Sequence, residues 1–136
     1  MPDYLDRLSR FVCETRLENL ESPTVDAAKS VVLDTIGAML AGSRLPENVK
    51  LAQLAAKTGG QGPATLLGQP GSATAVFAAL SNATAGVALE MDEGNRLGGG
   101  HAAIHVIPAA LAVAEERGAT GKEFLESVIA AYEVTS

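Results

Sequence analysis

Side chains that could do chemistry gather in one stretch of the sequence, EMDEGNRLGGGHAAIH, at residues 90–105. It holds three carboxylates within four residues, then an arginine, three consecutive glycines and both histidines of the chain. In order, these residues are Glu90, Asp92, Glu93, Arg96, Gly98, Gly99, Gly100, His101 and His105. Carboxylates and imidazoles exchange protons in acid–base catalysis, and an arginine binds a carboxylate through two parallel hydrogen bonds. The stretch therefore suggests acid–base chemistry on a small anionic substrate.

The acidic cluster, defined as Glu90, Asp92 and Glu93, is expected at the C-terminal end of a helix. Backbone carbonyls already carry partial negative charge there, and close carboxylates repel one another, so ionisation is unfavourable. If the segment is buried, one carboxyl can stay protonated and act as a general acid. If it is exposed, water removes most of this effect, and the cluster is a solvated helix end.

His101 is the stronger of the two histidine candidates for acid–base work, because it follows the glycines in a predicted loop. The glycines let the chain approach a ligand, but they form neither a dinucleotide fingerprint nor a P-loop. Arg96 could hold a substrate carboxylate, or it could neutralise Glu90 or Glu93 as a loop arginine. His105 has the i, i+4 spacing of a metal pair with His101, but a packed or capping role at a helix start is favoured.

Composition favours helices as the elements that position these residues. The chain is 47% hydrophobic but only 4% aromatic, and most of its apolar residues are Ala, Leu and Val. Close-packed helices suit this composition better than a β-sandwich. The predicted fold is all-α, a bundle of about six helices. They are expected at residues 3–19, 22–42, 47–57, 72 to the acidic cluster, 104–117 and from 121 onward, with a strand or extended segment at 64–67.

Helix signals support several of these boundaries. Ser22 is predicted to cap the second helix, and Gly42 to end it in a left-handed cap. Asp34 and Gly37 interrupt its apolar sequence, so we expect a hydrogen-bonded structural carboxylate and a close helix approach respectively. The helix capped by Ser72 is expected to bury one face, made of Val76, Leu80, Ala83, Val87 and Met91. The last helix begins with a capping box at Thr120 and Glu123.

Charge and cysteine content exclude several classes. A net charge of −6 without a basic cluster argues against nucleic-acid binding, and no apolar run reaches the ~20 residues of a membrane span. The single cysteine, Cys13, is expected to pack against a neighbouring element and is consistent with a cytoplasmic location. The helical pattern still runs at Ser136, which predicts a truncation inside a larger domain.

The order of several segments resembles the N-terminal region of the MmgE/PrpD family, from about residue 5 to 135. The segments are VVLDTIGAMLAGS, GPATLLG, AALSNATAGVALEMDEGN and GGGHAAIHVIPAALAVAEERGATGKEFLESVIAAYEV. The family includes 2-methylcitrate dehydratase, cis-aconitate decarboxylase and iminodisuccinate epimerase. The resemblance implies a homodimer in which each chain has a large helical domain and a smaller α/β lid domain. The active site then lies between the two domains.

The chemistry implied by this resemblance needs no cofactor and no metal. It is proton removal next to a carboxylate in a di- or tricarboxylic acid, followed by elimination, decarboxylation or reprotonation. Residues 1–136 would be the N-terminal portion of the helical domain, without the lid domain. The family's later site residues would lie beyond Ser136, so the isolated chain is expected to be inactive.

Residue by residue, the family pattern H-A-L-D-x-D-D-T corresponds here to VALEMDEG, residues 87–94. Glu90 stands where the family has a site aspartate, Asp92 matches directly, and His101 matches the site histidine. The resemblance therefore implies that His101 acts as acid or base, or hydrogen-bonds a substrate carboxylate, with Glu90 and Asp92 tuning it. Arg96, Gly94 and His105 are the expected substrate-binding residues.

Departures from the pattern argue against decarboxylase or methylcitrate specificity. Val87 replaces the leading histidine, Gly94 replaces a substrate-contacting threonine, and Ala102 replaces the usual proline after His101. A divergent subgroup with a different acid as substrate is the interpretation that fits them. The alternative function is a non-catalytic helical module that binds a partner helix or self-associates.

Overall fold

The structure is a computed structural model that describes residues 3–136. Within this range the chain forms six α-helices, one 3-10 turn and one two-stranded sheet. The elements are α1 (Tyr4–Glu14), η1 (Leu17–Asn19), α2 (Ser22–Gly42), α3 (Pro46–Thr58), β1 (Ala64–Thr65), β2 (Ser72–Ala73), α4 (Ala75–Val87), α5 (Ala102–Arg117) and α6 (Gly121–Thr135). The predicted all-α fold with about six helices is confirmed, and no helix in this range is long and apolar enough to cross a membrane.

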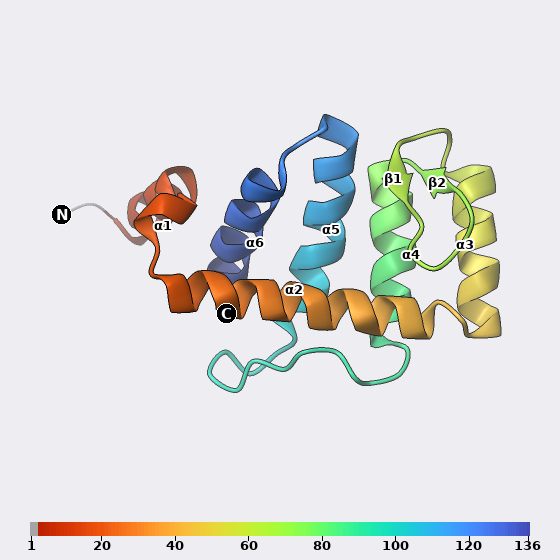
Figure 1. Ribbon diagram of the computed structural model, residues 1–136, viewed down its shortest axis with the longest axis horizontal. Coiled ribbons are helices and arrows are strands. Elements are labelled where there is room, and N and C mark those ends of the chain that lie inside the picture. Colours follow the sequence, from red (N-terminus) through yellow and green to blue (C-terminus); the bar gives the residue numbers. More distant parts are fainter. Residues whose placement is uncertain (1–2) are drawn as a thin grey trace.

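Helices α3, α4, α5 and α6 stand side by side in a row, and α2 runs along the row, across the ends of α6, α5 and α4 (Figure 1). The row follows the contacts, because α4 packs on α3 and α5, and α5 packs on α6. Helix α1 lies beyond α6, at the opposite end from α3 (Figure 1). Residues 88–101 connect α4 to α5 on the side of the row where α2 crosses the helix ends (Figure 1).

Two apolar clusters hold the row together. One joins α2, α5 and α6 and contains the fully buried side chains of Met39 and Ile107. The other joins α3, α4, α5 and the small sheet, and apart from Leu66 its buried members are all alanines. Small side chains allow the helix backbones to approach closely, so the alanines that dominate the composition form the contacts between the helices.

Two glycines mark the closest helix contacts. A Cβ atom on Gly42 of α2 would lie 1.9 Å from the carbonyl oxygen of Ala85 in α4, and one on Gly86 would lie 2.3 Å from Cδ1 of Ile104 in α5. The sequence prediction placed this role at Gly37, which is wrong, since nothing lies within 4 Å of its Cβ position. The prediction of a left-handed cap at Gly42 is also wrong, because Gly42 is helical and Ser43 caps α2 in a right-handed conformation.

Helix α4 buries a different face from the predicted one. Val76 is 75% exposed, Leu80 is 54% exposed and Met91, beyond the helix, is 71% exposed. The buried residues of α4 are Ala75, Ala78, Ser81, Asn82, Ala85 and Gly86. The prediction followed the large apolar side chains, whereas close contact with α2 and α5 requires the small ones. Val76, Leu80 and Val87 therefore form an exposed apolar stripe.

The predicted helix at residues 3–19 is broken after Glu14. Thr15 is buried and extended, and the backbone N–H of Leu17 in η1 donates a 2.9 Å hydrogen bond to Glu126 of α6. This tertiary contact holds the chain in a turn at residues where the apolar periodicity alone predicts that the helix continues. Cys13 is exposed rather than packed.

Three further details of the predicted elements need correction. Glu21 is the N-cap of α2 in place of Ser22. Ser72 lies in β2, so Thr74 is the N-cap of α4. Asp34 is exposed and has no hydrogen-bond or ion-pair partner among residues 3–136, so it is not the satisfied structural acid that was expected. By contrast, the capping box of Thr120 and Glu123 at the start of α6 is confirmed.

Of the segment expected to be extended, 64–67, the first two residues form β1, which pairs with β2 in an antiparallel hairpin, and Leu67 lies in the turn that follows. Buried Asn82 of α4 accepts a 2.9 Å bond from the N–H of Leu67 and donates a 2.9 Å bond to the carbonyl of Thr65. Glu115 of α5 accepts two bonds from Thr65, at 2.7 and 2.6 Å. The hairpin is therefore fixed onto α4 and α5.

Candidate active site

The acidic cluster lies in the connection between α4 and α5, not on a helix. Helix α4 ends at Val87, and Glu90 follows in a turn with the left-handed φ of 52° that is uncommon for a residue with a side chain. The three carboxylates are in different environments. Glu90 is exposed, whereas the Asp92 side chain is only 4% exposed and both oxygens of Glu93 accept hydrogen bonds.

Asp92 and His101 form the closest acid–base pair of the connection. Oδ2 of Asp92 lies 3.1 Å from Nδ1 of His101, whose side chain is 55% exposed. A buried carboxylate at Nδ1 favours the tautomer with its proton on that nitrogen, and it stabilises the imidazolium ion when the other nitrogen takes up a proton. The pair can therefore act as a base through Nε2 of His101. His101 lies in the loop as predicted, directly before α5.

Glu93 connects three parts of the chain. Its Oε2 accepts a 3.1 Å bond from the backbone N–H of Ala103 in the first turn of α5, and its Oε1 accepts a 2.5 Å bond from the hydroxyl of Tyr132 in α6. His101, the N-cap of α5, makes no capping bond with its side chain, so Glu93 takes over that function. Burial and the neighbouring Glu93 carboxylate raise the pKa of Tyr132 to about 12.

Sequence reasoning counted Glu93 as a member of the acidic cluster and overlooked Tyr132. The two residues lie on segments far apart in the sequence, and no local pattern joins them. One weak signal was present: α5 begins after His101 and Gly100, neither of which has a side-chain oxygen that could accept a hydrogen bond from the first backbone N–H groups of the helix. A helix start without its own cap needs an acceptor from elsewhere, and an unassigned nearby carboxylate is the natural source.

The glycine-rich segment forms a defined turn closed by Asn95. The N–H of Asn95 donates a 2.7 Å bond to the carbonyl of Gly100, and its side-chain oxygen accepts bonds from Leu97 and Gly98 at 2.9 and 3.0 Å. Gly99 has a left-handed φ of 74°, which favours glycine. Gly98 lies against Ser136, since its Cβ would be 2.8 Å from the Ser136 carbonyl oxygen.

An open hollow of about 460 Å³ lies over this turn. Its lining includes three of the predicted site residues, Gly94, Arg96 and His101. Arg96 is exposed and makes no ion pair with a carboxylate among residues 3–136, so its guanidinium remains available to a ligand. The structure thus brings an imidazole and a guanidinium to one surface, beside glycines whose lack of side chains leaves the hollow open.

Two predicted site residues lie apart from this hollow. Glu90 is exposed, and its side chain has no bonding partner within residues 3–136. His105 is the fourth residue of α5 and borders a groove between α5 and α6, but it is exposed and does not cap the helix, so the favoured packed or capping role is wrong. In the described part of the chain, no group of three or more His, Cys, Asp or Glu side chains could hold a metal ion.

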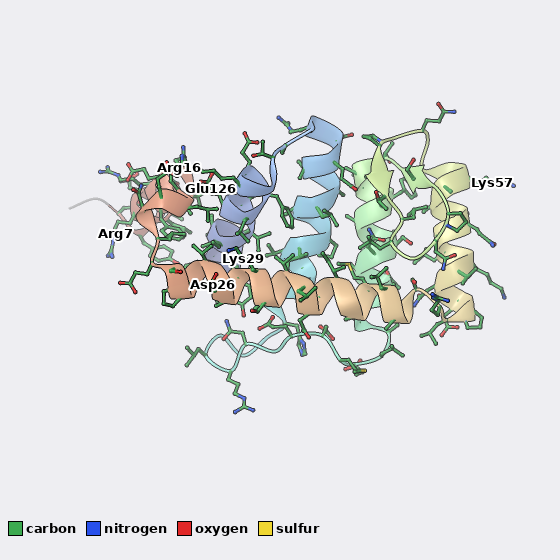
Figure 2. The ribbon with its side chains drawn as sticks, viewed as in Figure 1. Arg7, Arg16, Asp26, Lys29, Lys57 and Glu126 are labelled. Atoms are coloured by element: carbon green, nitrogen blue, oxygen red, sulfur yellow. The ribbon has the colours of Figure 1, made fainter. Side chains whose placement is uncertain are left out.

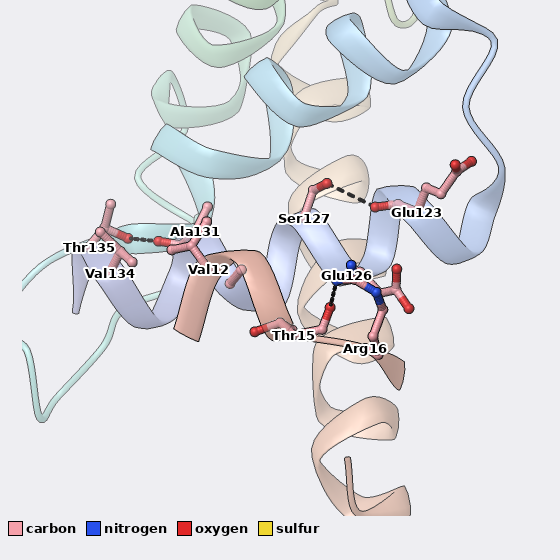
Figure 3. A pocket seen from close by; sticks show the side chains of 10 residues that line it. Val12, Thr15, Arg16, Glu123, Glu126, Ser127, Ala131, Val134 and Thr135 are labelled. Carbon is pink, nitrogen blue, oxygen red and sulfur yellow. Dashed lines mark hydrogen bonds between the residues drawn. The ribbon is translucent and has the colours of Figure 1, made fainter. Parts of the chain in front are cut away.

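A larger hollow, about 640 Å³, lies elsewhere, between the α1–η1 segment and α6 (Figure 3). Figure 2 shows Arg16 and Glu126 at this junction. Their polar groups are already engaged, because Arg16 donates a 2.7 Å bond to the Thr15 carbonyl and Glu126 accepts the bond from Leu17. The size of this hollow therefore does not indicate chemistry, and the smaller one beside His101 is the candidate site.

Comparison with known proteins gives one match. The sequence pattern of the MmgE/PrpD N-terminal domain matches residues 6–136. Neither the curated proteins nor the solved structures included a match to this chain.

Proposed function

This chain belongs to the MmgE/PrpD family, and from that premise we propose that it forms one wall of the active site of a cofactor-independent lyase or isomerase. The substrate is a small di- or tricarboxylate, and the reaction begins with removal of a proton next to a carboxylate. Elimination, decarboxylation or reprotonation then completes a dehydratase, decarboxylase or epimerase reaction.

The Asp92–His101 pair is the observation that carries this proposal. The Asp92 carboxylate, 4% exposed and 3.1 Å from Nδ1, directs the other nitrogen of His101 toward an incoming substrate. When Nε2 takes the substrate proton, the buried carboxylate compensates the positive charge of the ring. His101 is thus the proposed acid–base residue, and Asp92 orients and stabilises it.

Arg96 supplies the attraction for the substrate. The chain has a net charge of −6, so an anion must be held by local positive charge. Arg96 lines the same hollow as His101, and its planar guanidinium suits a carboxylate. Gly94 leaves space beside them. Glu90 enters the proposal only through the family pattern and His105 only through its spacing from His101, because neither residue lines this hollow.

The hollow needs a second wall. His101 is 55% exposed, whereas removal of a proton from carbon next to a carboxylate is favoured in a site that excludes water. We propose that a lid domain of the family type closes over Arg96 and His101, and that the working enzyme is a homodimer. Residues 3–136 by themselves are expected to bind the substrate weakly and not to turn it over.

A binding experiment on this chain tests the proposal directly. Succinate and citrate are titrated against the chain while the imidazole signals of His101 are followed by NMR, with sulfate as a generic anion. We expect both acids to shift the His101 signals, and Arg96→Gln to weaken their binding by about tenfold, the typical value of one charge-assisted contact. Arg44→Gln, at an exposed arginine outside the hollow, is the matched control and should bind as the wild type does.

Equal binding of both carboxylates by Arg96→Gln and the wild type would remove Arg96 from the site. Turnover of any dicarboxylate by the 136-residue chain alone would show that the proposed second wall is unnecessary. In a protein that combines these residues with the lid domain, His101→Ala should abolish turnover on a panel of di- and tricarboxylates. Unchanged turnover on every member would remove His101 from the mechanism.

A non-catalytic interaction module is the second candidate, because one observation favours it. The exposed apolar stripe of Val76, Leu80 and Val87 on α4 is a surface that a helix of another protein, or of a second copy, could cover. A stable oligomer of this chain without carboxylate binding would favour this reading over the enzyme.

A further inference from the structure

Both members of the proposed acid–base pair, Asp92 and His101, lie within two residues of a group that belongs to or contacts Glu93. Asp92 is followed in the chain by Glu93, and His101 stands two residues before Ala103, whose N–H donates to Oε2 of Glu93 at 3.1 Å. Residues 94–100, between Glu93 and His101, form the glycine-rich turn. Glu93 therefore closes the loop at its base, and the distance between Asp92 and His101 depends on that closure.

We propose that Glu93 is the positioning residue of this site and that Tyr132 of α6 is its anchor, so that together they hold Asp92 against His101. The catalytic meaning of this inference rests on the proposed function, but the anchoring itself can be tested without a substrate. Neither residue touches the hollow that Gly94, Arg96 and His101 line, so both act through the pair.

Tyr132 fixes Glu93 to the core. Its ring packs against the apolar cluster that contains Met39 and Ile107, and its hydroxyl donates a 2.5 Å bond to Oε1 of Glu93. Hydrogen bonds to an ionised carboxylate are stronger than those between neutral groups. The carboxylate also faces the positive end of the α5 helix dipole. Glu93 is thus held between two helices, and each of its oxygens has a donor.

The other attachments of the loop do not replace this one. Asn95 closes the turn onto Gly100 and donates from its amide to Ser136, which fixes the tip of the loop. None of those contacts involves the Asp92 carboxylate or Nδ1 of His101, although the Asn95 side chain also lies beside the Tyr132 hydroxyl. Without the Tyr132 hydroxyl, Glu93 keeps the N–H of Ala103 but can pivot about that single bond, and Asp92 moves with it.

Tyr132→Phe is the variant that isolates the anchor, because it removes one hydroxyl and keeps the packed ring. Tyr4→Phe is the matched control, since Tyr4 is 73% exposed and is the other tyrosine of the chain. The main readout is the tautomer of neutral His101, measured from the NMR shifts of its two ring nitrogens. An anchored Asp92 at 3.1 Å favours the Nδ1–H tautomer, and an unanchored one does not.

We expect the wild type and Tyr4→Phe to show mainly the Nδ1–H form, and Tyr132→Phe to show a mixture of the two forms. Asp92→Asn serves as the reference for a pair without its carboxylate. Glu93→Gln keeps an acceptor for Ala103 and should give a mixture as well. A change in melting temperature alone would suit any lost hydrogen bond, so melting curves serve only to confirm that each variant is folded.

Succinate binding separates this inference from the proposed function. If the correctly held loop falls to about a third of the population in Tyr132→Phe, apparent affinity falls about threefold. An altered tautomer in Tyr132→Phe supports the anchor, even if the wild type binds no carboxylate and the proposed function fails. A wild-type tautomer and wild-type affinity in Tyr132→Phe would overturn the anchor and leave the proposed function intact.

Discussion

At the residue scale, the candidate site depends on the contacts of four side chains. Asp92 lies 3.1 Å from one ring nitrogen of His101, while the two oxygens of Glu93 accept hydrogen bonds from the Ala103 backbone and the Tyr132 hydroxyl. Glu93 is adjacent to Asp92 in the sequence, but its carboxylate contacts α5 and α6 and not His101. Neighbouring carboxylates can therefore belong to one site while one orients the imidazole and the other holds the backbone.

Tyr132 gives the first prediction at this scale, because burial and Glu93 raise its pKa from 10.0 to about 12. The folded protein thus holds the phenol proton more tightly than the unfolded chain. The associated stability is fully present below about pH 10 and is lost as the pH rises toward 12. In the Tyr4→Phe variant, where Tyr132 is the remaining tyrosine, ultraviolet absorbance of the folded protein should show tyrosinate forming near pH 12.

The same titration in urea provides the unfolded reference, for which we expect a midpoint near the ordinary tyrosine value of about 10. Tyr132→Phe should lose less stability than the wild type as the pH rises through this range. Coinciding titration curves for the folded and urea-unfolded Tyr4→Phe protein would contradict the partly buried hydrogen bond from Tyr132 to Glu93.

The sequence could indicate the members of the site more readily than their contacts. Residue types and spacing pointed to Asp92 and His101, and the structure brings their side chains together; their catalytic roles stay predictions. The same reasoning grouped Glu90 with them, yet Glu90 faces solvent after the helix has ended. Tyr132 could not be found this way, because its link to Glu93 exists only once α5 and α6 pack side by side.

At the element scale, helix positions follow from local signals, but helix faces depend on which residues meet. The capping box at Thr120 and the extended segment at Ala64 were predictable because their causes lie within a few residues. The buried face of α4 was not, since it consists of alanines, Ser81, Asn82 and Gly86. Large apolar residues usually mark the core, but here the helices approach so closely that only small side chains fit between them.

A matched pair of glycine substitutions in α2 tests this packing. Gly37→Ala should stabilise the protein by about 0.5–1 kcal/mol, because the residue is exposed, helical and free of neighbours. Gly42→Ala should destabilise it by about 1–3 kcal/mol or more, because the new Cβ would lie 1.9 Å from the Ala85 carbonyl oxygen, and a backbone atom cannot swing aside. Urea unfolding followed by circular dichroism measures both.

The two substitutions are the same chemical change in the same helix. Helix propensity therefore cannot explain changes of opposite sign in the free energy of unfolding. A stabilising Gly42→Ala would mean that α2 and α4 do not cross in contact at Gly42 and Ala85. A strongly destabilising Gly37→Ala would mean that another element covers that side of α2.

At the scale of the whole molecule, the row of helices is not equally fixed along its length. Helix α5 stands between α4 and α6 and buries seven of its residues, whereas α1 at the end of the row buries none (Figure 1). The number and type of the helices could be predicted from periodicity. The crossing of α2 over the row could not, because it depends on contacts such as Gly42 with Ala85 that lie far apart in the sequence.

Hydrogen exchange should follow this unequal burial. Local opening costs little where few apolar contacts are lost, so the amides of α1 should exchange on the order of a hundredfold faster than those around Ile107 in α5. Exchange followed by mass spectrometry at low protein concentration measures the difference, and equal protection of α1 and α5 there would contradict it. Protection of α1 that rises with concentration would instead show that a second copy covers its exposed apolar residues, among them Leu5 and Val12, as the proposed homodimer allows. The candidate site would then adjoin the well-buried N-terminal part of α5, and the contact between the two copies would lie on α1, which opens most easily.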